Sequence, residues 1–240
     1  MGLLTLLNRR SVASNPVFAP TDIAGLVVWL KADTLALNDG DPVTTWADQS
    51  GSGNDLAQAT ASLKPTYQTN EINGRPIVQA DGSDDEMETA GSLTLKPVTV
   101  VFVARPTNFT NYRTIFGSGT DGGLQIRFTQ TTGTVHTLAQ STAAIATSTG
   151  TAVAATPIMV AFSYSAVGAY VFRLDGAADS SGTNDQTITA EPIILLNHGT
   201  APGGEPFIGG LGELLIYDSV LAEADIISLE TYLNGRWAVF

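Results

Sequence analysis

The sequence predicts a single all-β sandwich with one short helix near its C-terminal end. Hydrophobic residues make up 43% of the 240 residues and charged residues only 14%, which is enough apolar material for a substantial core. The 24 glycines and 11 prolines are scattered along the chain, as expected where many strands need many turns. This length suits one large sandwich as well as two small domains. Short apolar runs bounded by turn residues favour the sandwich.

Apolar runs of strand length recur from residue 26 onward. In the run 123–128, Leu124, Ile126 and Phe128 alternate with polar residues, so they share one face of a pleated strand. The pair Asp175-Gly176 is a strong turn signal after one of the runs. The predicted strands are 26–30, 98–104, 114–116, 123–128, 158–164, 170–174, 193–196 and 212–217.

Residues 129–156 are rich in Thr, Ala, Ser and Gly, with weak alternation. Small and β-branched side chains of this kind suit edge strands or a long loop, and both interpretations stay open.

A helix is predicted over residues 223–233. Ile226, Leu229 and Leu233 fall at positions i, i+3 and i+7 and form one apolar stripe. Acidic residues in the first turn stabilise the helix through a favourable interaction with its dipole. The Asn-Gly pair at 234–235 predicts the end of the helix.

The charge and the cysteine count exclude several classes of protein. The net charge is −12 with a pI of about 4.3, and the basic residues are well separated apart from Arg9-Arg10. Without a basic stripe to neutralise phosphates, nucleic acid and anionic membranes are disfavoured as partners. The absence of cysteine excludes disulfides and thiolate metal sites, and it fits assembly in a reducing cytoplasm.

Residues 1–20 are expected to form an extended N-terminal arm before a domain at 21–240. The leucine-rich start is too short for a membrane span and matches no export or lipidation signal. Exposing four leucine side chains to water is unfavourable. The arm is therefore expected either to fold back on its own domain or to dock on a neighbouring subunit. The expected partner-binding residues are Leu3, Leu4, Leu6, Leu7, Arg9 and Arg10.

Five motifs carry a resemblance to a known family. They are D-I-A-G-L-V-V-W-L-K-A-D at 22–33, W-A-D-Q-S-G-S-G-N-D-L at 46–56, G-R-P-I-V at 74–78 followed by D-G-S-D-D at 81–85, I-G-G-L-G-E-L-L-I-Y-D at 208–218, and Y-L-N-G-R-W at 232–237. In this order the motifs resemble the concanavalin A-like, laminin-G-like lectin/glucanase domains common in bacteriophage virion proteins. The resemblance covers about residues 21–237. It implies an antiparallel two-sheet jelly-roll sandwich.

The resemblance fixes the fold more closely than the function, because this fold carries lectins, glycanases, adhesion modules and virion proteins. It implies first a non-enzymatic capsid decoration protein, held by its arm to the major capsid protein or other virion subunits. Such a protein would be a homo-oligomer, such as a trimer, in a virion assembled in the host cytoplasm. The alternative is a carbohydrate-binding module of a tail or fibre that recognises a host glycan. A glycoside hydrolase ranks third.

The strongest catalytic candidates are Asp84, Glu86 and Glu88, which a single strand would place on one face. Some jelly-roll glucanases use alternating carboxylates as nucleophile and acid/base, in the order E-x-D-x-E. Here the order is D-x-E-x-E, and the motif follows the turn residues 81–83. We therefore expect a solvated acidic turn and assign no catalytic residue.

No metal or cofactor is assigned. Asp48, Asn54 and Asp55 lie in a glycine-rich loop whose oxygens suit calcium, although a tight turn satisfied by its own side chains is the simpler interpretation. His136 and His198 are the only histidines, and neither has the neighbours of a hydrolase triad or a zinc site. The chain has no phosphate-cradling or dinucleotide-binding loop.

Three tryptophans are candidate sugar platforms. Trp29 lies in an apolar strand and Trp237 follows the predicted helix, so both are expected to pack. Trp46 precedes the glycine-rich loop and is the one tryptophan for which a sugar-binding role stays open.

Overall fold

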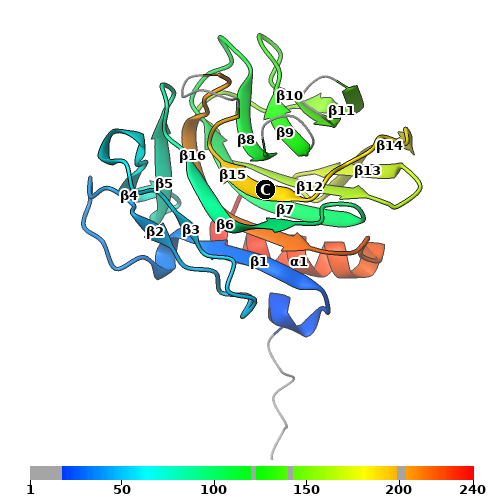
Figure 1. The fold of residues 1–240 in the computed structure, drawn as a ribbon, viewed down its shortest axis with the longest axis horizontal. Coiled ribbons are helices and arrows are strands. Elements are labelled where there is room, and N and C mark those ends of the chain that lie inside the picture. The colour runs from blue at the N-terminus through cyan, green and yellow to red at the C-terminus, as the bar shows by residue number, and fades with distance from the viewer. Residues whose placement is uncertain (1–17, 120–122, 140–142, 199–203) are drawn as a thin grey trace, which may run out of the picture.

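The computed structural model describes residues 18–119, 123–139, 143–198 and 204–240, and in them two antiparallel sheets pack face to face (Figure 1). The first, sheet A, has the order β14 (Ala177–Thr183), β13 (Ala169–Leu174), β12 (Ile158–Tyr164), β7 (Val98–Pro106), β16 (Ile208–Tyr217), β5 (Arg75–Asp81) and β4 (Thr66–Ile72), with β1 (Leu26–Lys31) also paired to β16. The second, sheet B, has the order β11 (Ala143–Thr151), β10 (Thr134–Ala139), β9 (Leu124–Phe128), β8 (Arg113–Ser118), β15 (Glu191–Leu195), β6 (Met87–Leu93), β3 (Leu56–Ala57) and β2 (Thr45–Trp46). The predicted all-β sandwich is confirmed.

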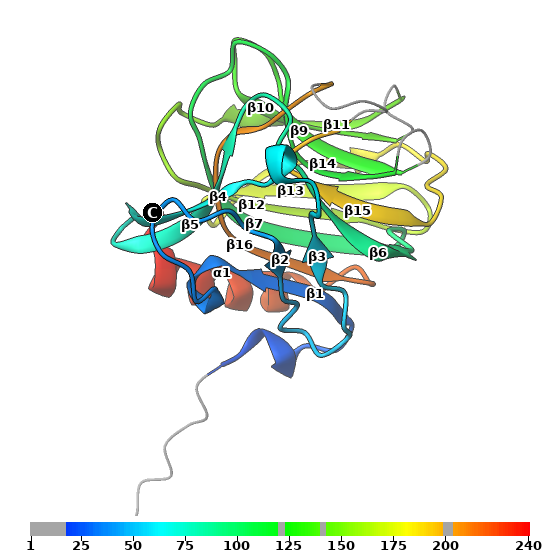
Figure 2. The same cartoon turned by 60° about the vertical axis from the view of Figure 1, so that its left-hand side comes forward.

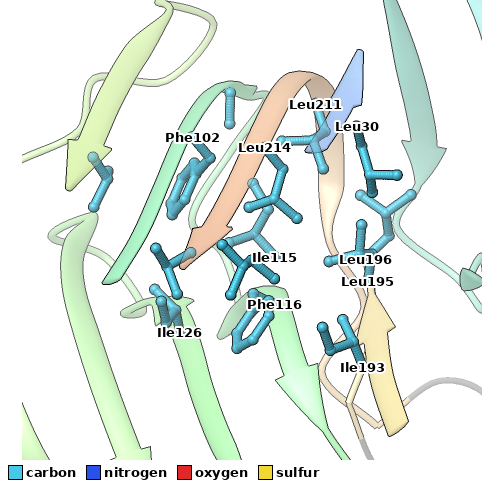
Figure 3. Packing of buried hydrophobic residues seen from close by; sticks show 14 of the residues in the cluster. Leu30, Phe102, Ile115, Phe116, Ile126, Ile193, Leu195, Leu196, Leu211 and Leu214 are labelled. Carbon is cyan, nitrogen blue, oxygen red and sulfur yellow. The ribbon is translucent and has the colours of Figure 1, made fainter. Parts of the chain in front are cut away.

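The main core lies between the sheets. Figure 3 shows Phe102 and Leu214 of sheet A facing Ile115, Phe116 and Ile126 of sheet B, all of them buried. Each fully buried side chain of this size stabilises the fold by about 1.5–3 kcal/mol. The alternation expected for the strand 123–128 is confirmed, because its apolar residues all join this core.

Sheet A is apolar on both faces, which explains why its central strand reads as a continuous apolar run. In β7, Val100 and Phe102 face the main core, while Val101 and Val103 belong to a second cluster on the opposite face. The helix α1 (Glu223–Trp237) covers that outer face and lies beside β1 in Figures 1 and 2. A strand buried on both faces loses the period-2 signal.

The helix begins where the sequence predicts and ends later. Its stripe of Ile226, Leu229 and Leu233 is buried as expected, but the end expected at 234–235 is wrong, because the helix continues to Trp237. The last turn is held because the Trp237 indole is fully buried against Gly212, where a Cβ atom would lie only 2.7 Å from the ring. Tertiary packing here outweighs the local stop signal.

A buried carboxylate ties this helix to sheet A. Glu213 on β16 is fully buried and accepts hydrogen bonds from Trp29 Nε1 at 2.8 Å and Tyr232 Oη at 3.2 Å. It also accepts bonds from Arg236 Nε at 3.0 Å and Trp237 Nε1 at 2.8 Å. Four donors thus compensate for burying the charge of Glu213. Three of the motifs quoted above meet at this one carboxylate.

The segment left open at 129–156 contains strands. It forms β10 and the edge strand β11, joined to the β9–β8 ladder. The edge strand of the other sheet, β14, has the sequence Ala-Ala-Asp-Ser-Ser-Gly-Thr and no apolar pattern, which is why no strand was expected there. The Asp179 carboxylate of β14 accepts bonds from the backbone N–H groups of Thr149 and Gly150 on β11, which closes this side of the sandwich.

Part of the expected arm lies against the domain. The Phe18 ring packs against Tyr232 with a centroid distance of 6.2 Å, and the Pro20 carbonyl accepts a hydrogen bond from Tyr217 Oη. The expected partner-binding residues, 3–10, lie outside the described residues. No helix in the described part of the chain is both long and apolar enough to cross a membrane.

Candidate functional site

Four loops meet at one end of the sandwich around a hollow of about 340 Å³, which we call the loop-end pocket. The loops follow β5, β7, β9 and β15. The strands β9 and β15 both pair antiparallel with β8, and β5 and β7 both pair antiparallel with β16, so within each sheet these strands end on the same side. The lining residues are Gly82, Ser83, Asn111, Tyr112, Gln130, Gly204, Glu205 and Pro206.

The carboxylate of Glu205 is the charged group of the pocket, and side chains on the outer face of sheet B hold it in place. Glu205 forms an ion pair with Arg127 of β9. Its Oε2 accepts hydrogen bonds from Thr114 Oγ1 at 2.9 Å and from Gln125 Nε2 at 2.5 Å. Because Thr114 and Gln125 are almost completely buried, Glu205 has little freedom to move.

Tyr112 supplies the aromatic surface of the pocket. The guanidinium carbon of Arg127 lies 3.9 Å from the centroid of the Tyr112 ring, a cation–π contact that fixes the ring from one side. Arg127 therefore positions both Tyr112 and Glu205. Within the described residues, Gln125 Oε1 and Arg127 Nε are buried without a hydrogen-bond partner, so this network keeps unused bonding capacity.

An acidic turn borders the pocket, on the loop that contributes Gly82 and Ser83. Asp81, Asp84 and Asp85 each present a carboxylate oxygen within 4.8 Å of the others, and oxygens so arranged could hold a hard cation. Asp85 is buried and accepts a bond from the Asp81 N–H at 2.9 Å. Burial, with the charges of Asp81 and Asp84, raises the pKa of Asp85 to about 6.

The three carboxylates considered for catalysis do not share one strand. Asp84 lies in the turn, Glu86 lies just before β6, and Glu88 lies within β6. The pKa of Glu86 is raised by burial and by the charges of Glu88 and Asp84, while a hydrogen bond from Asn197 acts in the opposite direction. The hollow that Glu88 lines, of about 500 Å³, has no aromatic residue among its described lining residues.

The glycine-rich loop considered for calcium protects the free edge of β1. The Asp48 carboxylate accepts bonds from the N–H groups of Trp29, Ser50 and Asn54 at 2.8, 2.9 and 3.0 Å, and from Ser50 Oγ at 2.7 Å. The Asn54 amide donates to the Val27 carbonyl at 2.8 Å. Protein donors thus already use both Asp48 oxygens, which supports the tight-turn interpretation. The loop also blocks an otherwise unpaired strand edge.

In the same loop, Asp55 Oδ1 accepts a bond from the Asp48 N–H at 2.8 Å. Trp46 is fully buried in the main core, so it cannot serve as a sugar platform. Trp29 and Trp237 pack around Glu213, as expected.

The histidines lie near the outer face of sheet B. His136 pairs with Arg127 across β10 and β9, and burial together with the Arg127 charge lowers its pKa. His198 is buried, and a Cβ atom on Gly117 of β8 would lie 2.8 Å from its ring. Among the described residues, neither histidine belongs to a cluster of three or more His, Cys, Asp or Glu side chains that could bind a metal ion.

The sequence predictions included only one of the four loops of the pocket, the turn at 81–83, and assigned no binding role to it. The alternation in 123–128 placed Gln125 and Arg127 on the polar face of a strand, but Glu205 is 78 residues from Arg127 and no spacing connects the two. Tyr112 stands alone between turn residues, and the run that contains it has no distinctive motif.

Residues 81–227 match the sequence family described as the concanavalin A-like lectin/glucanases superfamily. This stretch spans more than half of the chain, including β6 to β16 and the start of α1. The chain belongs to this superfamily. Membership explains the two-sheet sandwich, and it leaves the ligand open because lectins and glucanases share the fold. No curated protein matches this lectin/glucanase-type chain in sequence.

Solved structures share the lectin/glucanase fold at low sequence identity. Domain 4 of AbnA, a GH43 extracellular arabinanase from Geobacillus stearothermophilus solved in complex with arabinotriose, is 18% identical with a TM-score of 0.61 and covers 85% of this chain and 98% of its own. The binding domain of botulinum neurotoxin serotype D is 12% identical with a TM-score of 0.60, covering 87% of this chain and 51% of its own. The binding domain of botulinum neurotoxin DC, in complex with SialylT, is 12% identical with a TM-score of 0.63, covering 90% and 52%. The present chain spans about half the length of the neurotoxin domains.

Proposed function

We propose that this protein is a non-enzymatic carbohydrate-binding module that holds a glycan in the loop-end pocket. The observation that carries the proposal is the pocket itself, where an aromatic ring, a fixed carboxylate and exposed amide and hydroxyl side chains converge from four loops. These are the groups of Tyr112, Glu205, Asn111, Gln130 and Ser83. Binding sites in general combine such apolar and polar groups in a concave surface.

The chemistry of a sugar matches these groups. A pyranose or furanose ring presents C–H groups on its faces, and an aromatic side chain packs against them while its hydroxyl group remains free to hydrogen bond. The ring edge presents hydroxyl groups. One of them can donate to Glu205 Oε1, which accepts a bond from Arg127 and has a second acceptor position, whereas Thr114 and Gln125 both donate to Oε2. Other hydroxyl groups can exchange donors and acceptors with Asn111 and Gln130. Each element of the ligand has a counterpart in the pocket.

Preorganisation strengthens such a site. The Arg127 guanidinium packs on Tyr112 and pairs with Glu205, so these two contact groups are largely ordered before a ligand arrives. A ligand then loses less free energy to the ordering of side chains. Buried Thr114 and Gln125 also donate hydrogen bonds to the Glu205 carboxylate, which fixes it further.

One further observation supports binding over catalysis. Glu86 and Glu88, two of the three carboxylates considered for catalysis, do not line the loop-end pocket, and the Glu205 carboxylate that does line it is paired with Arg127. An arabinanase domain solved with arabinotriose shares the fold. A sequence identity of 18% shows a shared fold only, so the proposal of a glycan ligand rests on the pocket.

Glycan-array screening followed by calorimetric titration tests the proposal. We expect reproducible binding of one glycan group, with Tyr112→Ala and Asn111→Ala each weakening binding about tenfold, which corresponds to about 1.4 kcal/mol. Thr45→Ala, in the hollow lined by Glu88, is the matched control and should leave affinity unchanged. Absence of glycan binding, or an equal loss in the control variant, would contradict the proposal.

A role in a phage particle is a second candidate, and the leucine-rich segment before the domain favours it. In this account the protein decorates a capsid as a homo-oligomer, held by residues 1–20, and the pocket faces solvent. Comparing the full-length chain with a variant lacking residues 1–20, in binding to undecorated particles of the source phage, tests it. Binding by the full-length chain alone supports an arm anchor, and binding by neither rejects the decoration role.

A further inference from the structure

We infer that the glycan held in the loop-end pocket is a neutral saccharide, and that sugars bearing a carboxylate, such as sialic or uronic acids, are discriminated against. The inference rests on the proposed function and adds the chemical class of the ligand. It follows from the unequal distribution of charge around the pocket.

Carboxylates lie on two of the four loops that form the pocket. Glu205 lines it directly, and the loop that supplies Gly82 and Ser83 also carries Asp81, Asp84 and Asp85. Asp81 is exposed and Asp84 is partly exposed, so their fields reach the solvent at the pocket rim.

The two arginines beside the pocket lining, Arg113 and Arg127, are buried and already bind other groups of the protein. The Arg127 guanidinium is buried beneath Tyr112 and paired with Glu205, so the two charges largely cancel. Arg113 is also buried, and its Nη1 and Nη2 atoms donate to the Pro206 carbonyl and to Asn108 Oδ1 at 3.0 and 2.9 Å. The described lining of the pocket contains no lysine and no arginine. Among the described lining residues, a ligand carboxylate would therefore find no free cation.

Coulomb's law gives the size of the affinity loss expected for an acidic ligand. Two like charges about 8 Å apart in water repel enough to weaken binding about twofold, so three aspartates together give roughly a tenfold effect at low salt. The Debye length is about 8 Å at physiological ionic strength, so salt should reduce the effect strongly. Hydrogen bonds to neutral hydroxyl groups do not share this salt dependence.

Titration with matched glycans tests the inference. Calorimetry at pH 7.5 in low-salt buffer containing EDTA compares a neutral oligosaccharide that binds with the same oligosaccharide carrying a terminal sialic or uronic acid. We expect the acidic form to bind about tenfold more weakly. The difference should shrink to threefold or less at about 0.5 M salt and to about fivefold in Asp84→Asn at low salt. Glu223→Gln, which removes the same charge on α1 at the other sheet, is the control and should leave the difference unchanged.

The outcomes separate the two claims. If the acidic glycan binds as well as the neutral one or better, the neutral-saccharide inference is wrong while the carbohydrate-binding function stands. If the neutral glycan is preferred but neither salt nor Asp84→Asn changes the ratio, charge is not the cause and the inference also fails. If no glycan of either kind binds, the proposed function itself is wrong.

Discussion

Replacing Glu213 by glutamine should destabilise the protein by about 3–5 kcal/mol, because one carboxylate joins β1, β16 and α1. The side chain is fully buried, and its two oxygens accept four hydrogen bonds. An amide of the same shape turns one acceptor into a donor that faces N–H donors, and it removes the ion pair with Arg236. Hydrogen bonds to charged groups contribute about 1.5–3 kcal/mol each, and breaking a buried ion pair costs about 3–5 kcal/mol. These effects overlap, so the larger one sets the magnitude.

Denaturant unfolding followed by tryptophan fluorescence measures this loss directly, since the indoles of Trp29 and Trp237 both donate to Glu213. In a chain of this length, the loss corresponds to a fall in Tm of roughly 6–20 °C. Glu88→Gln, an exposed change on β6, is the matched control and should stay within about 0.5 kcal/mol. If Glu213→Gln does not fold, Trp29→Phe removes a single donor and should cost about 1–2 kcal/mol. A loss below 1 kcal/mol in Glu213→Gln would refute the reasoning.

Three further changes test other parts of the structure. Asp48→Ala should lower the unfolding free energy by about 2–4 kcal/mol in denaturant titrations, because a half-buried carboxylate that accepts four hydrogen bonds disappears; an unchanged midpoint would exclude its role at the β1 edge. Gly212→Ala should cost about 1–3 kcal/mol in the same assay, because the new Cβ would lie 2.7 Å from the Trp237 ring, and a wild-type stability would show that α1 moves aside freely. Burial raises the pKa of Asp85 from 3.8 to about 6, so the folded state binds the proton more tightly, and the stability this proton provides is lost as pH rises from about 4 through 6. Asp85→Asn should flatten that part of the pH–stability profile, and a profile identical to the wild type would contradict the assignment.

The parts of the fold that the sequence predicted are those with dense apolar patterns. The strand 158–164 coincides with β12, and the helix begins at Glu223 as expected, because both elements bury apolar faces that are visible in the sequence. The strand β14 was missed because its residues are small, polar and mostly exposed, and it is held by pairing with β13 and by Asp179. Pairing of this kind leaves no local signal.

The candidate site was less predictable than the fold. The quoted motifs led first to the Asp48 loop and to Trp46, and both turn out to be structural: one protects the β1 edge and the other fills the core. The pocket instead depends on single residues from separate loops, such as Tyr112 and Glu205, which only the sandwich brings together. Such residues follow no spacing rule, because the loops that carry them are free to vary while the strands stay fixed.

The most direct test of the account is to locate the bound sugar. Backbone NMR shifts recorded during titration with the neutral glycan that binds on the array would identify the residues it contacts. We expect the largest shift changes at Ser83, Asn111, Tyr112 and Gln130, and we expect these changes to disappear in Tyr112→Ala. Largest changes around Thr45 and Glu88 in the other hollow, with the loop-end pocket unaffected, would contradict it.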